Sequence, residues 1–474
     1  MTHLPAGRAV VAPEEEGLDS RALSQALEHS QRLDLHLHSL LIMRRGRLVL
    51  DVRLFPFARG QVHGVASVTK SVTATLVGIA LRLGYLKRVE QRLLDLLPGR
   101  TVAFRDSLKE AITLKDLLTM SSGLACVNQP TEVTLYDMRA SPDWIQFALD
   151  LPMSDRPGAR FVYHSAASHL LSAVVQEATG QSLLDFGRKH LFGPLGFGKV
   201  MWAPDPQGYS RGWGHLYLLP EDMAKLGLLY LNDGVWAGER LLPERWVAAA
   251  TRKQVSALPQ EDGYGYLWWI PSTGGYQAAG IGGQSVVVRP DLQLVVVTTG
   301  SGRSALTKEW VRNAIVPSVR SSGPLPADAA AVAELRARAD ALAQPPKRHA
   351  VPDLPATAAE VSGRLFNLEA NDLSWRQVAL SFSTGEPTAT LVRDGDELPI
   401  GLDGAPRVVA EPRGGGPIAL HGEWETSDTF ALVYDTISHY RTFRLRLRFA
   451  GHTVHIKALE YAFGHEVEFT GSAA

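Results

Sequence analysis

The chain has 474 residues and a mass of 51.6 kDa, which exceeds the size of one simple core, so we expect about two or three domains. Its 48 basic and 49 acidic residues leave a formal net charge of −1. This balance excludes the basic footprint that is typical of nucleic-acid-binding proteins, so we expect no nucleic-acid partner.

The sequence also lacks the patterns of membrane and disulfide-rich proteins. No run of about eighteen apolar residues occurs, so we expect no membrane span and no membrane partner. Residues 1–8 lack the continuous apolar core of a signal peptide, and we therefore expect a cytoplasmic location. Cys126 is the only cysteine, which excludes an intramolecular disulfide and a cysteine-based metal cluster. We interpret it as a packed thiol rather than a nucleophile.

The first predicted elements are a helix and a β-hairpin. The helix lies within residues 17–35 and starts near Asp19 and Ser20. The hairpin consists of apolar runs at 37–43 and 47–51 around a turn that contains a glycine.

The next predicted helix begins with the tetrapeptide Ser67-Val68-Thr69-Lys70. A serine and a lysine three residues apart share one face of a first helical turn, so the lysine amine can reach the serine hydroxyl. Everything between Lys70 and Arg82 is small or apolar, which predicts a buried helix. Burial disfavours a charged ammonium, and a neutral amine can accept the serine proton. The alternative is an ordinary helix start with a capping serine and a solvated lysine.

Beyond this helix the periodicity is mostly helical as far as Thr251, for example in the segment 161–180 with its glycine stop. Strand character returns at 267–270, 285–288 and 294–298. Because strands flank a helical middle, we expect one sheet built from both ends of this region, with a helical subdomain inserted at about 86–261.

Two further segments carry candidate chemistry. Tyr163 precedes a predicted helix, where it is either a half-buried packing residue or a phenol that can shuttle protons. Gly280, Ile281 and Gly282 precede a predicted strand. They form either a tight turn or an exposed strand edge whose backbone N–H groups can bind a substrate and an oxyanion.

The remainder of the chain predicts a linker and a second domain. We assign residues 1–322 to the first domain, 323–356 to a linker with an alanine-rich helix and 357–474 to a β-rich domain. Residues 443–449 alternate strictly between apolar side chains and arginines. Such a row suits either nucleic acid or the solvated face of an antiparallel sheet, and the charge balance favours the solvated face.

Other candidates have weaker support. His36 and His38 have the spacing that places two side chains on one face of a strand, but no third metal ligand is evident, so we interpret them as packed or surface histidines. His63 is close to Ser67 in sequence and either lines its cleft or has a role in a loop. We expect no metal and no cofactor.

The segments 67–70, 157–165 and 276–284, in this order, resemble the β-lactamase-related serine hydrolases. This superfamily includes class C β-lactamases, D,D-peptidases, family VIII esterases and 6-aminohexanoate-oligomer hydrolases. The blocks 112–124, 221–227 and 263–269 look like its non-lactamase members. The resemblance covers roughly residues 10–320.

The resemblance implies an α/β, β-lactamase/penicillin-binding-protein-like fold. Its expected parts are an antiparallel sheet flanked by helices, an inserted helical subdomain and a C-terminal all-β domain. It implies that Ser67 is the nucleophile, Lys70 its base or proton relay and Tyr163 the catalytic tyrosine. The N–H groups of Ser67 and Ile281 would hold the oxyanion, and Gly280 and Gly282 would bind substrate beside Ile281.

Two positions depart from the family pattern. Ser165 stands where the family often has asparagine, which keeps a hydrogen-bonding side chain but loses the amide. Residues 279–281 are Ala-Gly-Ile where lactamases carry Lys-Thr-Gly, and no cation is near in sequence. A penicillin carboxylate therefore lacks its usual partner.

We therefore expect a hydrolase that forms an acyl-enzyme on Ser67 and cleaves a small ester, amide or peptide, with little β-lactamase activity. Two alternatives stay open. One is a non-catalytic penicillin-binding-like protein that holds peptidoglycan or a peptide, and the other is an interaction protein whose β domain carries the function. Several aromatic residues either line the cleft or pack in the core: Trp213, Tyr217, Tyr264, Tyr266, Trp268 and Trp269.

Overall fold

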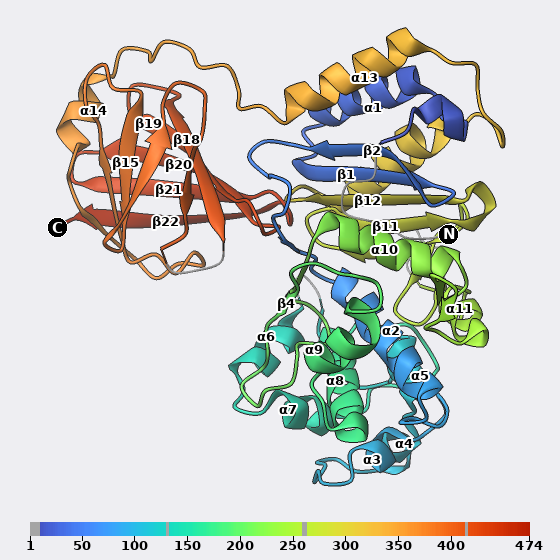
Figure 1. The fold of residues 1–474 in the computed structure, drawn as a ribbon. Coiled ribbons are helices and arrows are strands. Elements are labelled where there is room, and N and C mark those ends of the chain that lie inside the picture. Colours follow the sequence, from blue (N-terminus) through green and yellow to red (C-terminus); the bar gives the residue numbers. More distant parts are fainter. Residues whose placement is uncertain (1–9, 129–131, 258–262, 413–415) are drawn as a thin grey trace.

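A computed structural model describes residues 10–128, 132–257, 263–412 and 416–474 (Figure 1). The segment inspected for a signal peptide and the predicted end of the helical subdomain near 261 lie outside the described residues. Within the described ranges, no helix has the length and apolar character needed to cross a membrane.

A seven-stranded antiparallel sheet, in the order β2-β1-β12-β11-β10-β9-β8, forms the centre of the first domain. The predicted hairpin is confirmed, with Ile42 opposite Leu50. Strands from both ends of the region share this sheet, as expected from the sequence. The strands are β1 (Leu37–Arg44), β2 (Arg47–Arg53), β8 (Gly263–Tyr264), β9 (Trp269–Ile270), β10 (Tyr276–Gly280), β11 (Gln284–Arg289) and β12 (Leu294–Gly300).

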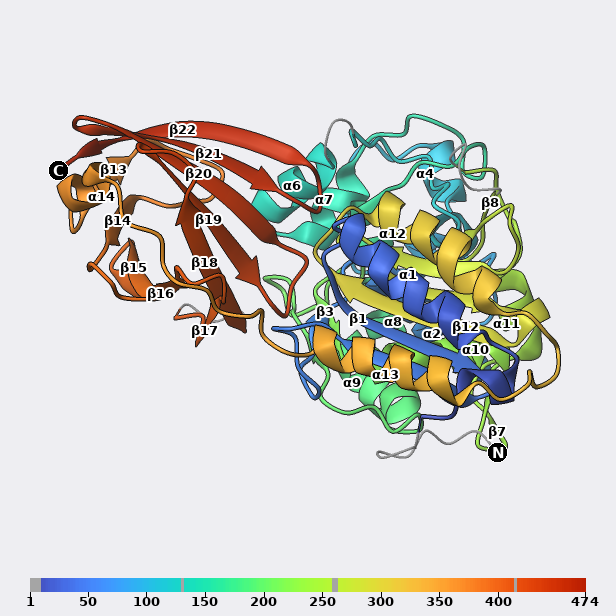
Figure 2. The same ribbon diagram turned by 90° about the horizontal axis from the view of Figure 1, so that it is seen from above.

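Three helices cover one face of the sheet (Figure 2), namely α1 (Ser20–Arg32), α12 (Ser304–Trp310) and α13 (Ala329–Leu342). Asp19 starts α1, because its carboxylate accepts the N–H groups of Arg21 and Ala22. The alanine-rich helix of the predicted linker is α13. It packs against α1, with Leu335 only 2% exposed and Asp328 paired with Arg21 at 2.8 Å.

The other face carries α10 (Pro220–Leu231) and α2 (Val68–Arg82), and α8 (Ser165–Thr179) packs against α2. Small residues allow these helices to approach closely. A Cβ on Gly227 of α10 would lie 2.6 Å from Val295 Cγ1, and one on Gly78 of α2 would lie 2.6 Å from the Trp246 ring. The buried residues between these helices and the sheet form the largest apolar cluster of the molecule.

The middle of the first domain is mostly helical, as predicted, but it also contains short strands. α8 ends at Gly180, which takes the left-handed conformation at φ 68°. Strands β3, β5 and β4 form a small sheet, and β6 pairs with β7. The elements are β3 (His63–Gly64), α3 (Leu93–Leu96), α4 (Ser107–Ala111), α5 (Leu114–Leu118), α6 (Val133–Ala140), α7 (Trp144–Asp150), α9 (Leu183–Gly187), β4 (Met201–Trp202), β5 (Leu216–Leu218), β6 (Val235–Trp236), β7 (Glu239–Arg240) and α11 (Glu244–Ala250).

The C-terminal all-β domain is a ten-stranded sheet in the order β16-β15-β14-β13-β22-β21-β20-β19-β18-β17, preceded by α14 (Ala356–Val361). An additional parallel pairing of β16 with β18 closes the sheet on itself. The strands are β13 (Phe366–Leu368), β14 (Gln377–Ser381), β15 (Thr388–Arg393), β16 (Asp396–Gly401), β17 (Arg407–Ala410), β18 (Pro417–Trp424), β19 (Thr429–Thr436), β20 (Thr442–Ala450), β21 (Thr453–Glu460) and β22 (His465–Ala473).

The arginine row of β20 lies on the solvated face of this sheet, as the charge balance favoured. Leu445 and Leu447 point inward and are at most 1% exposed. Arg444 and Arg446 point outward, and both bind the carboxylate of Glu425, at 2.8 Å and 2.7 Å. The alternation in the sequence therefore reports one buried and one wet face.

Candidate active site

Ser67 and Lys70 lie side by side at the start of α2. The Lys70 Nζ donates to Ser67 Oγ at 2.9 Å and to the Trp213 carbonyl at 3.0 Å. Ser67 is the residue before the first turn of α2, and Lys70 is only 1% exposed. Ala66, directly before Ser67, has φ 47°, a left-handed conformation that costs energy in a non-glycine residue. The structure thus brings together the two residues that the S-x-x-K spacing predicted to meet.

Polar side chains along α2 tie this helix to the loops around it. Thr69 Oγ1 donates to the Ala66 carbonyl at 2.6 Å, which closes the first turn. Ser71 Oγ donates to the Leu267 carbonyl at 2.6 Å, and Thr73 Oγ1 donates to that of Gly212 at 2.9 Å. Each of these buried hydroxyls therefore has an acceptor, and the bonds of Ser71 and Thr73 fix α2 against two different segments.

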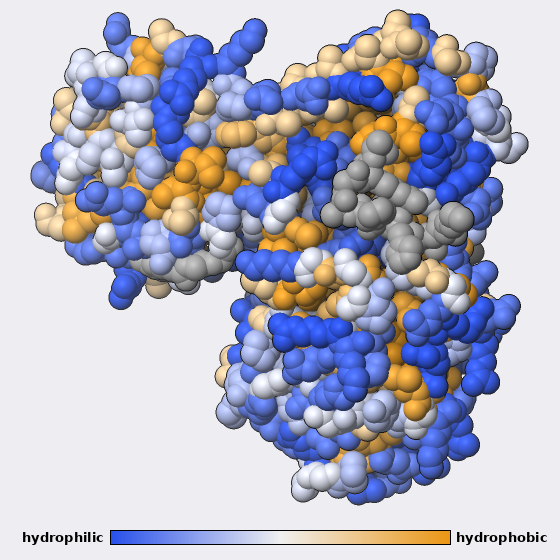
Figure 3. Space-filling view, viewed as in Figure 1, coloured by the Kyte–Doolittle hydropathy of each residue, from blue (hydrophilic) through white to orange (hydrophobic). Residues whose placement is uncertain are grey.

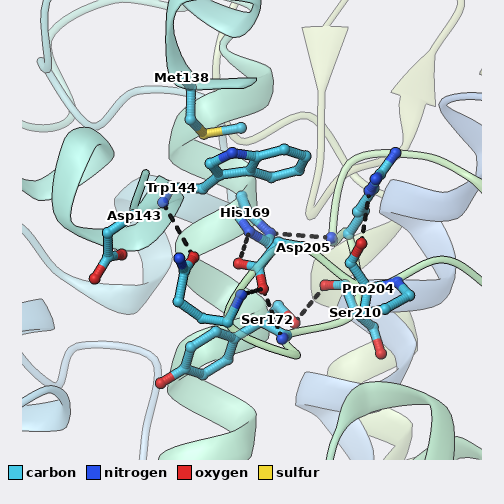
Figure 4. Close-up of polar contacts among 12 residues, drawn as sticks. Met138, Asp143, Trp144, His169, Ser172, Pro204, Asp205 and Ser210 are labelled. Carbon is cyan, nitrogen blue, oxygen red and sulfur yellow. Dashed lines mark hydrogen bonds and ion pairs between the residues drawn. The ribbon is translucent and has the colours of Figure 1, made fainter. Parts of the chain in front are cut away.

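A buried hydrogen bond between His169 and Asp205 supports the loop that holds Lys70 (Figure 4). His169 Nε2 lies 3.0 Å from the Asp205 carboxylate, and both side chains are inaccessible to solvent. The Gly212 N–H donates to His169 Nδ1 at 3.3 Å, so Nδ1 is the acceptor and the proton is on Nε2. Burial is the largest influence on His169 and lowers its pKa, against the opposing effect of Asp205. Trp213, whose carbonyl binds Lys70, directly follows Gly212.

Further hydrogen bonds, most of them accepted by Asp205, fix the same loop. The Asp205 carboxylate accepts the N–H groups of Gln207 at 2.9 Å and Tyr209 at 2.8 Å. Ser172 Oγ on α8 donates to the Ser210 carbonyl at 2.6 Å (Figure 4). The loop from Asp205 to Trp213 is therefore held at several points, and with it the carbonyl that receives the Lys70 amine.

Tyr163 lies beside Lys70, just before α8. The centroid of its ring is 4.8 Å from Lys70 Nζ, and the ring stacks on Trp269 at 5.9 Å. Asn128 Nδ2 donates to the Tyr163 carbonyl at 3.0 Å. Burial raises the pKa of Cys126, which also contacts this carbonyl, to about 11, as expected of a packed thiol rather than a nucleophile.

The end of β10 approaches the backbone of Ser67 closely. A Cβ on Gly280 would lie 2.7 Å from the Val65 carbonyl oxygen and 2.9 Å from the Ser67 nitrogen, so only glycine allows this approach. Within the described ranges, neither the Ser67 N–H nor the Ile281 N–H has a hydrogen-bond acceptor. Two N–H groups near the serine are thus available to a bound group.

These residues border a cavity of about 490 Å³. Of the predicted site residues, Ser67, Tyr163, Gly280 and Ile281 line it. The remaining wall is mostly aromatic or small: Gly64, Ala66, Asn128, Glu132, Leu135, Tyr136, Arg139, Trp213, Gly214, His215, Tyr217, Trp269, Ala279, Ser304, Lys308, His439, Tyr440 and Phe463.

Lys70, Ser165 and Gly282, which were also predicted, lie behind this wall. Lys70 does not line the cavity itself, but its amine bonds to Ser67 Oγ, which does. Ser165 is 1% exposed, and its hydroxyl has no partner among the residues described. Gly282 packs against Tyr440, where a Cβ would lie 2.4 Å from the Tyr440 Cβ.

Sequence reasoning missed several wall residues. The sequence shows no cation near 279–281, but Lys308 of α12 and Arg139 of α6 both reach the wall. Lys308 Nζ lies 5.0 Å from the Trp269 ring centroid. Asn128 places an amide beside Tyr163, although position 165 carries none. No local pattern identifies these residues, because only the tertiary fold brings them to the cavity.

For several aromatic residues and for His63, the sequence allowed either a place in the cavity wall or another role, and the structure separates them. Trp213, Tyr217 and Trp269 line the cavity, whereas Tyr264, Tyr266 and Trp268 pack in the core. His63 is fully buried and bonds to His38 across 2.9 Å, while the cavity wall contains its neighbour Gly64 instead. The described residues contain no group of three side chains arranged to hold a metal ion.

Comparisons with known proteins agree on one family. A family model described as Beta-lactamase matches residues 30–312, which is more than half of the chain. The 6-aminohexanoate-dimer hydrolase of Paenarthrobacter ureafaciens is 24% identical over 292 residues, which cover 57% of this chain and 74% of that protein. Penicillin-binding protein 4 of Amycolatopsis lactamdurans is 28% identical over 285 residues, covering 50% and 73%. A penicillin-binding protein homologue from Caulobacter crescentus has a similar fold, with a TM-score of 0.53 at 17% identity, covering 66% of this chain and 100% of that one.

Proposed function

The chain belongs to the β-lactamase family, and from this membership we propose that it is a serine hydrolase that cleaves an ester or amide bond through an acyl-enzyme on Ser67. One observation carries the proposal. A lysine that is only 1% exposed places its amine 2.9 Å from the hydroxyl of a serine that lines a cavity. This arrangement suits a serine nucleophile with a lysine base.

Acylation starts with proton transfer from Ser67. In its neutral form the Lys70 amine accepts the hydroxyl proton while Oγ attacks the carbonyl carbon of the substrate. The Trp213 carbonyl accepts a hydrogen bond from the same amine and keeps it aimed at Oγ. Attack forms a bond between Oγ and the carbonyl carbon, and the carbonyl oxygen becomes an oxyanion.

The N–H groups of Ser67 and Ile281 are placed to bind that oxyanion. Their lack of other acceptors supports this role, since preorganised donors stabilise developing charge without reorganisation. The tetrahedral intermediate collapses when the bond to the leaving oxygen or nitrogen breaks. Tyr163, beside Lys70, relays the proton from the lysine to the leaving group. Lys70 then takes a proton from a water molecule that attacks the acyl carbon. The bond from this carbon to Oγ breaks, Oγ regains a proton from Lys70, and the carboxylic acid leaves.

The preferred substrate is an ester or amide rather than a β-lactam. The segment 279–281 supplies no cation for a penicillin carboxylate, and two cations that reach the cavity wall, Lys308 and Arg139, come from other elements. Two relatives carry names that point to amide-like and penicillin-like ligands, respectively a hydrolase of the 6-aminohexanoate dimer and a penicillin-binding protein.

Turnover of p-nitrophenyl esters from acetate to dodecanoate, measured beside nitrocefin, tests this function. We expect ester turnover that Ser67→Ala abolishes, with little nitrocefin hydrolysis. Ester turnover at the parent rate in Ser67→Ala would show that another residue is the nucleophile. If the parent turned over neither class and took no fluorophosphonate label, the non-catalytic binding protein would be the better account.

A further inference from the structure

The C-terminal domain supplies part of the wall of the cavity. His439 and Tyr440 lie in the turn between β19 and β20, and Phe463 lies in the turn between β21 and β22. All three line the cavity together with Ser67. The strands that carry these turns extend toward the first domain (Figures 1 and 2), and apolar side chains gather where the two domains meet (Figure 3). The cavity is therefore built from both domains.

The turn at 437–441 contacts both segments that surround the nucleophile. The Gly64 N–H, three residues before Ser67, donates to the Ser438 carbonyl at 2.8 Å. Tyr440 packs on Gly282, the residue after Ile281. The turn thus bridges the segments that carry the two free N–H groups, at the point where a substrate carbonyl would be held.

Buried contacts fix this turn to the first domain. The hydroxyl of Thr442 lies 2.7 Å from Ser301 Oγ and 2.8 Å from the Asp435 carboxylate. Ser301 Oγ lies 3.3 Å from His38, which bonds to His63, and the residues Thr442, Ser301, His38 and His63 are each at most 4% exposed. A chain of polar contacts therefore runs from the C-terminal domain to the strand that precedes Ser67.

An apolar contact on the other side of the turn adds to this attachment. Ile437 is fully buried and packs with Phe57 and Ala419 in a small cluster that joins the two domains. Together with the polar contacts, it holds the turn in one position. A fixed wall can discriminate between substrates by shape, which a mobile loop does poorly.

The wall that this turn provides is uncharged. Burial lowers the pKa of His439 to about 3, so its imidazole is neutral at ordinary pH. Its ring lies 4.1 Å from that of Tyr440 and 6.3 Å from that of Tyr217 on the first domain. Burial also lowers the pKa of His215, on the same side of the cavity, to about 4. Neutral rings at these distances suit contact with an apolar group.

We propose that the turn at 437–441 is a substrate-binding wall in which His439 and Tyr440 contact an uncharged, apolar group of the substrate and limit its length. This inference rests on the proposed ester or amide hydrolysis at Ser67. It assigns a specificity-determining role to the C-terminal domain, which lies outside the residues that the family model matches.

Two series of esters test the wall in the full-length protein. One series varies the acyl chain of p-nitrophenyl esters, and the other varies the alcohol of alkyl acetates, so that either side of the scissile bond can report the contact. For each variant the ratio of kcat/KM for the longest and the shortest ester is compared with that of the parent. In the double variant His439→Ala, Tyr440→Ala we expect this ratio to rise about tenfold or more in one series.

A variant that should change the kcat/KM ratio in the opposite direction keeps the test independent of any loss of stability. His439→Trp adds bulk to the wall and should lower the ratio in the same series by a similar factor. His452→Ala, in the exposed turn between β20 and β21, is the matched control and should leave the ratio at the parent value.

Two outcomes would overturn the inference, and they can be told apart. If the parent shows Ser67-dependent turnover but every variant keeps the parent ratio in both series, the wall has no role in specificity and the proposed hydrolysis stands. If the parent shows neither Ser67-dependent turnover nor a fluorophosphonate adduct, the proposed function and this inference fail together.

Discussion

Helix α2 and the inner face of strand β20 are both buried, yet they bury different kinds of side chains. The buried face of α2 includes Lys70 and four hydroxyl residues, each with a hydrogen-bond partner on a neighbouring segment or turn. In β20 the buried residues are Leu445, Leu447, Phe449 and one polar residue, Thr442, at the end that meets the first domain.

The difference indicates what each element contributes. A buried polar side chain adds little net stability, but it specifies where its partner must lie. A buried leucine stabilises through the area it removes from water and specifies little about distant loops. Polar burial along α2 therefore surrounds the proposed catalytic pair Ser67 and Lys70, and the single buried polar residue of β20 lies two residues after Tyr440, which lines the same cavity.

The largest expected effect is the loss of Lys70. Lys70→Ala should lower kcat/KM for a p-nitrophenyl ester by about a thousandfold or more, since the serine then has no base. Ser67→Ala combined with Lys70→Ala should be no worse than Ser67→Ala alone, because the two residues act as a unit. Steady-state kinetics of the three variants measure this.

Lys109 offers a matched control for that substitution. Like Lys70 it is 1% exposed and donates two hydrogen bonds, here to the carbonyls of Ala103 and Leu149, but it does not line the cavity. Lys109→Ala should lower the midpoint of urea unfolding while kcat stays within about twofold of the parent. An equal loss of rate in both lysine variants would mean that burial of any lysine, rather than contact with Ser67, explains the effect.

In contrast to Lys70→Ala, a substitution inside the C-terminal sheet should lower stability and leave the catalytic rate unchanged. Leu447→Ala removes a side chain that is 1% exposed and should lower the free energy of unfolding of this domain by about 2–5 kcal/mol. Its catalytic rate on p-nitrophenyl acetate at room temperature should stay near that of the parent, because Leu447 and its cross-strand partners Phe430 and Ile456 do not line the cavity. Urea unfolding followed by tryptophan fluorescence, together with kinetics, separates the two quantities. A large loss of rate without unfolding would contradict the distinction between the polar burial of α2 and the apolar burial of β20.

A smaller effect on rate is expected when Asp205 is replaced by asparagine. Asp205→Asn removes the charge that faces His169 and loosens the loop that ends at Trp213. We expect kcat to fall roughly 10- to 100-fold with little change in KM, since a displaced Trp213 carbonyl no longer aims Lys70. Asp185→Asn on α9, where the carboxylate is exposed, should change neither. If Asp205→Asn lowered stability alone, the network would be structural only.

Acidification should weaken the first domain gradually. Burial lowers the pKa of His38 to about 3 and that of His164 to about 4, whereas the value in an unfolded chain is about 6.5. Below pH 6.5 the unfolded chain therefore binds protons that the native state does not. Stability should fall as the pH drops from about 6.5 toward 4, by up to about 1.4 kcal/mol per pH unit for each such histidine.

Urea unfolding at a series of pH values measures this slope. His164→Gln should reduce it, whereas the exposed His452→Gln should leave it unchanged. A slope of the opposite sign, with stability rising as the pH falls from 6.5, would mean that these histidines are charged in the native state.

The sequence predicted those parts of the site that depend on short-range geometry. Ser67 and Lys70 meet because they lie one helical turn apart, and the hairpin at β1 and β2 follows from alternating apolar runs around a glycine. The arginine row of β20 could be assigned to the wet face because side chains alternate strictly along a strand.

The remaining wall residues depend on contacts between distant segments. Lys308 and Tyr440 come to the cavity through the packing of α12 on the sheet and the docking of the C-terminal domain. Among the aromatics, Trp268 is core and Trp269 is wall, although the two are adjacent in sequence. Composition cannot separate them, because the local path of the chain decides which one faces inward. The roles of Ser67, Lys70 and Tyr163 and the domain boundaries at 322 and 357 stay predictions.

The most direct test of the central claim is the mass of the intact protein after incubation with an alkyl fluorophosphonate. The account predicts a single adduct per chain, mapped by peptide mass spectrometry to Ser67, absent in Ser67→Ala and formed far more slowly in Lys70→Ala. An adduct that persists in Ser67→Ala, or its absence from the parent, would contradict the claim that Lys70 activates Ser67 as the nucleophile.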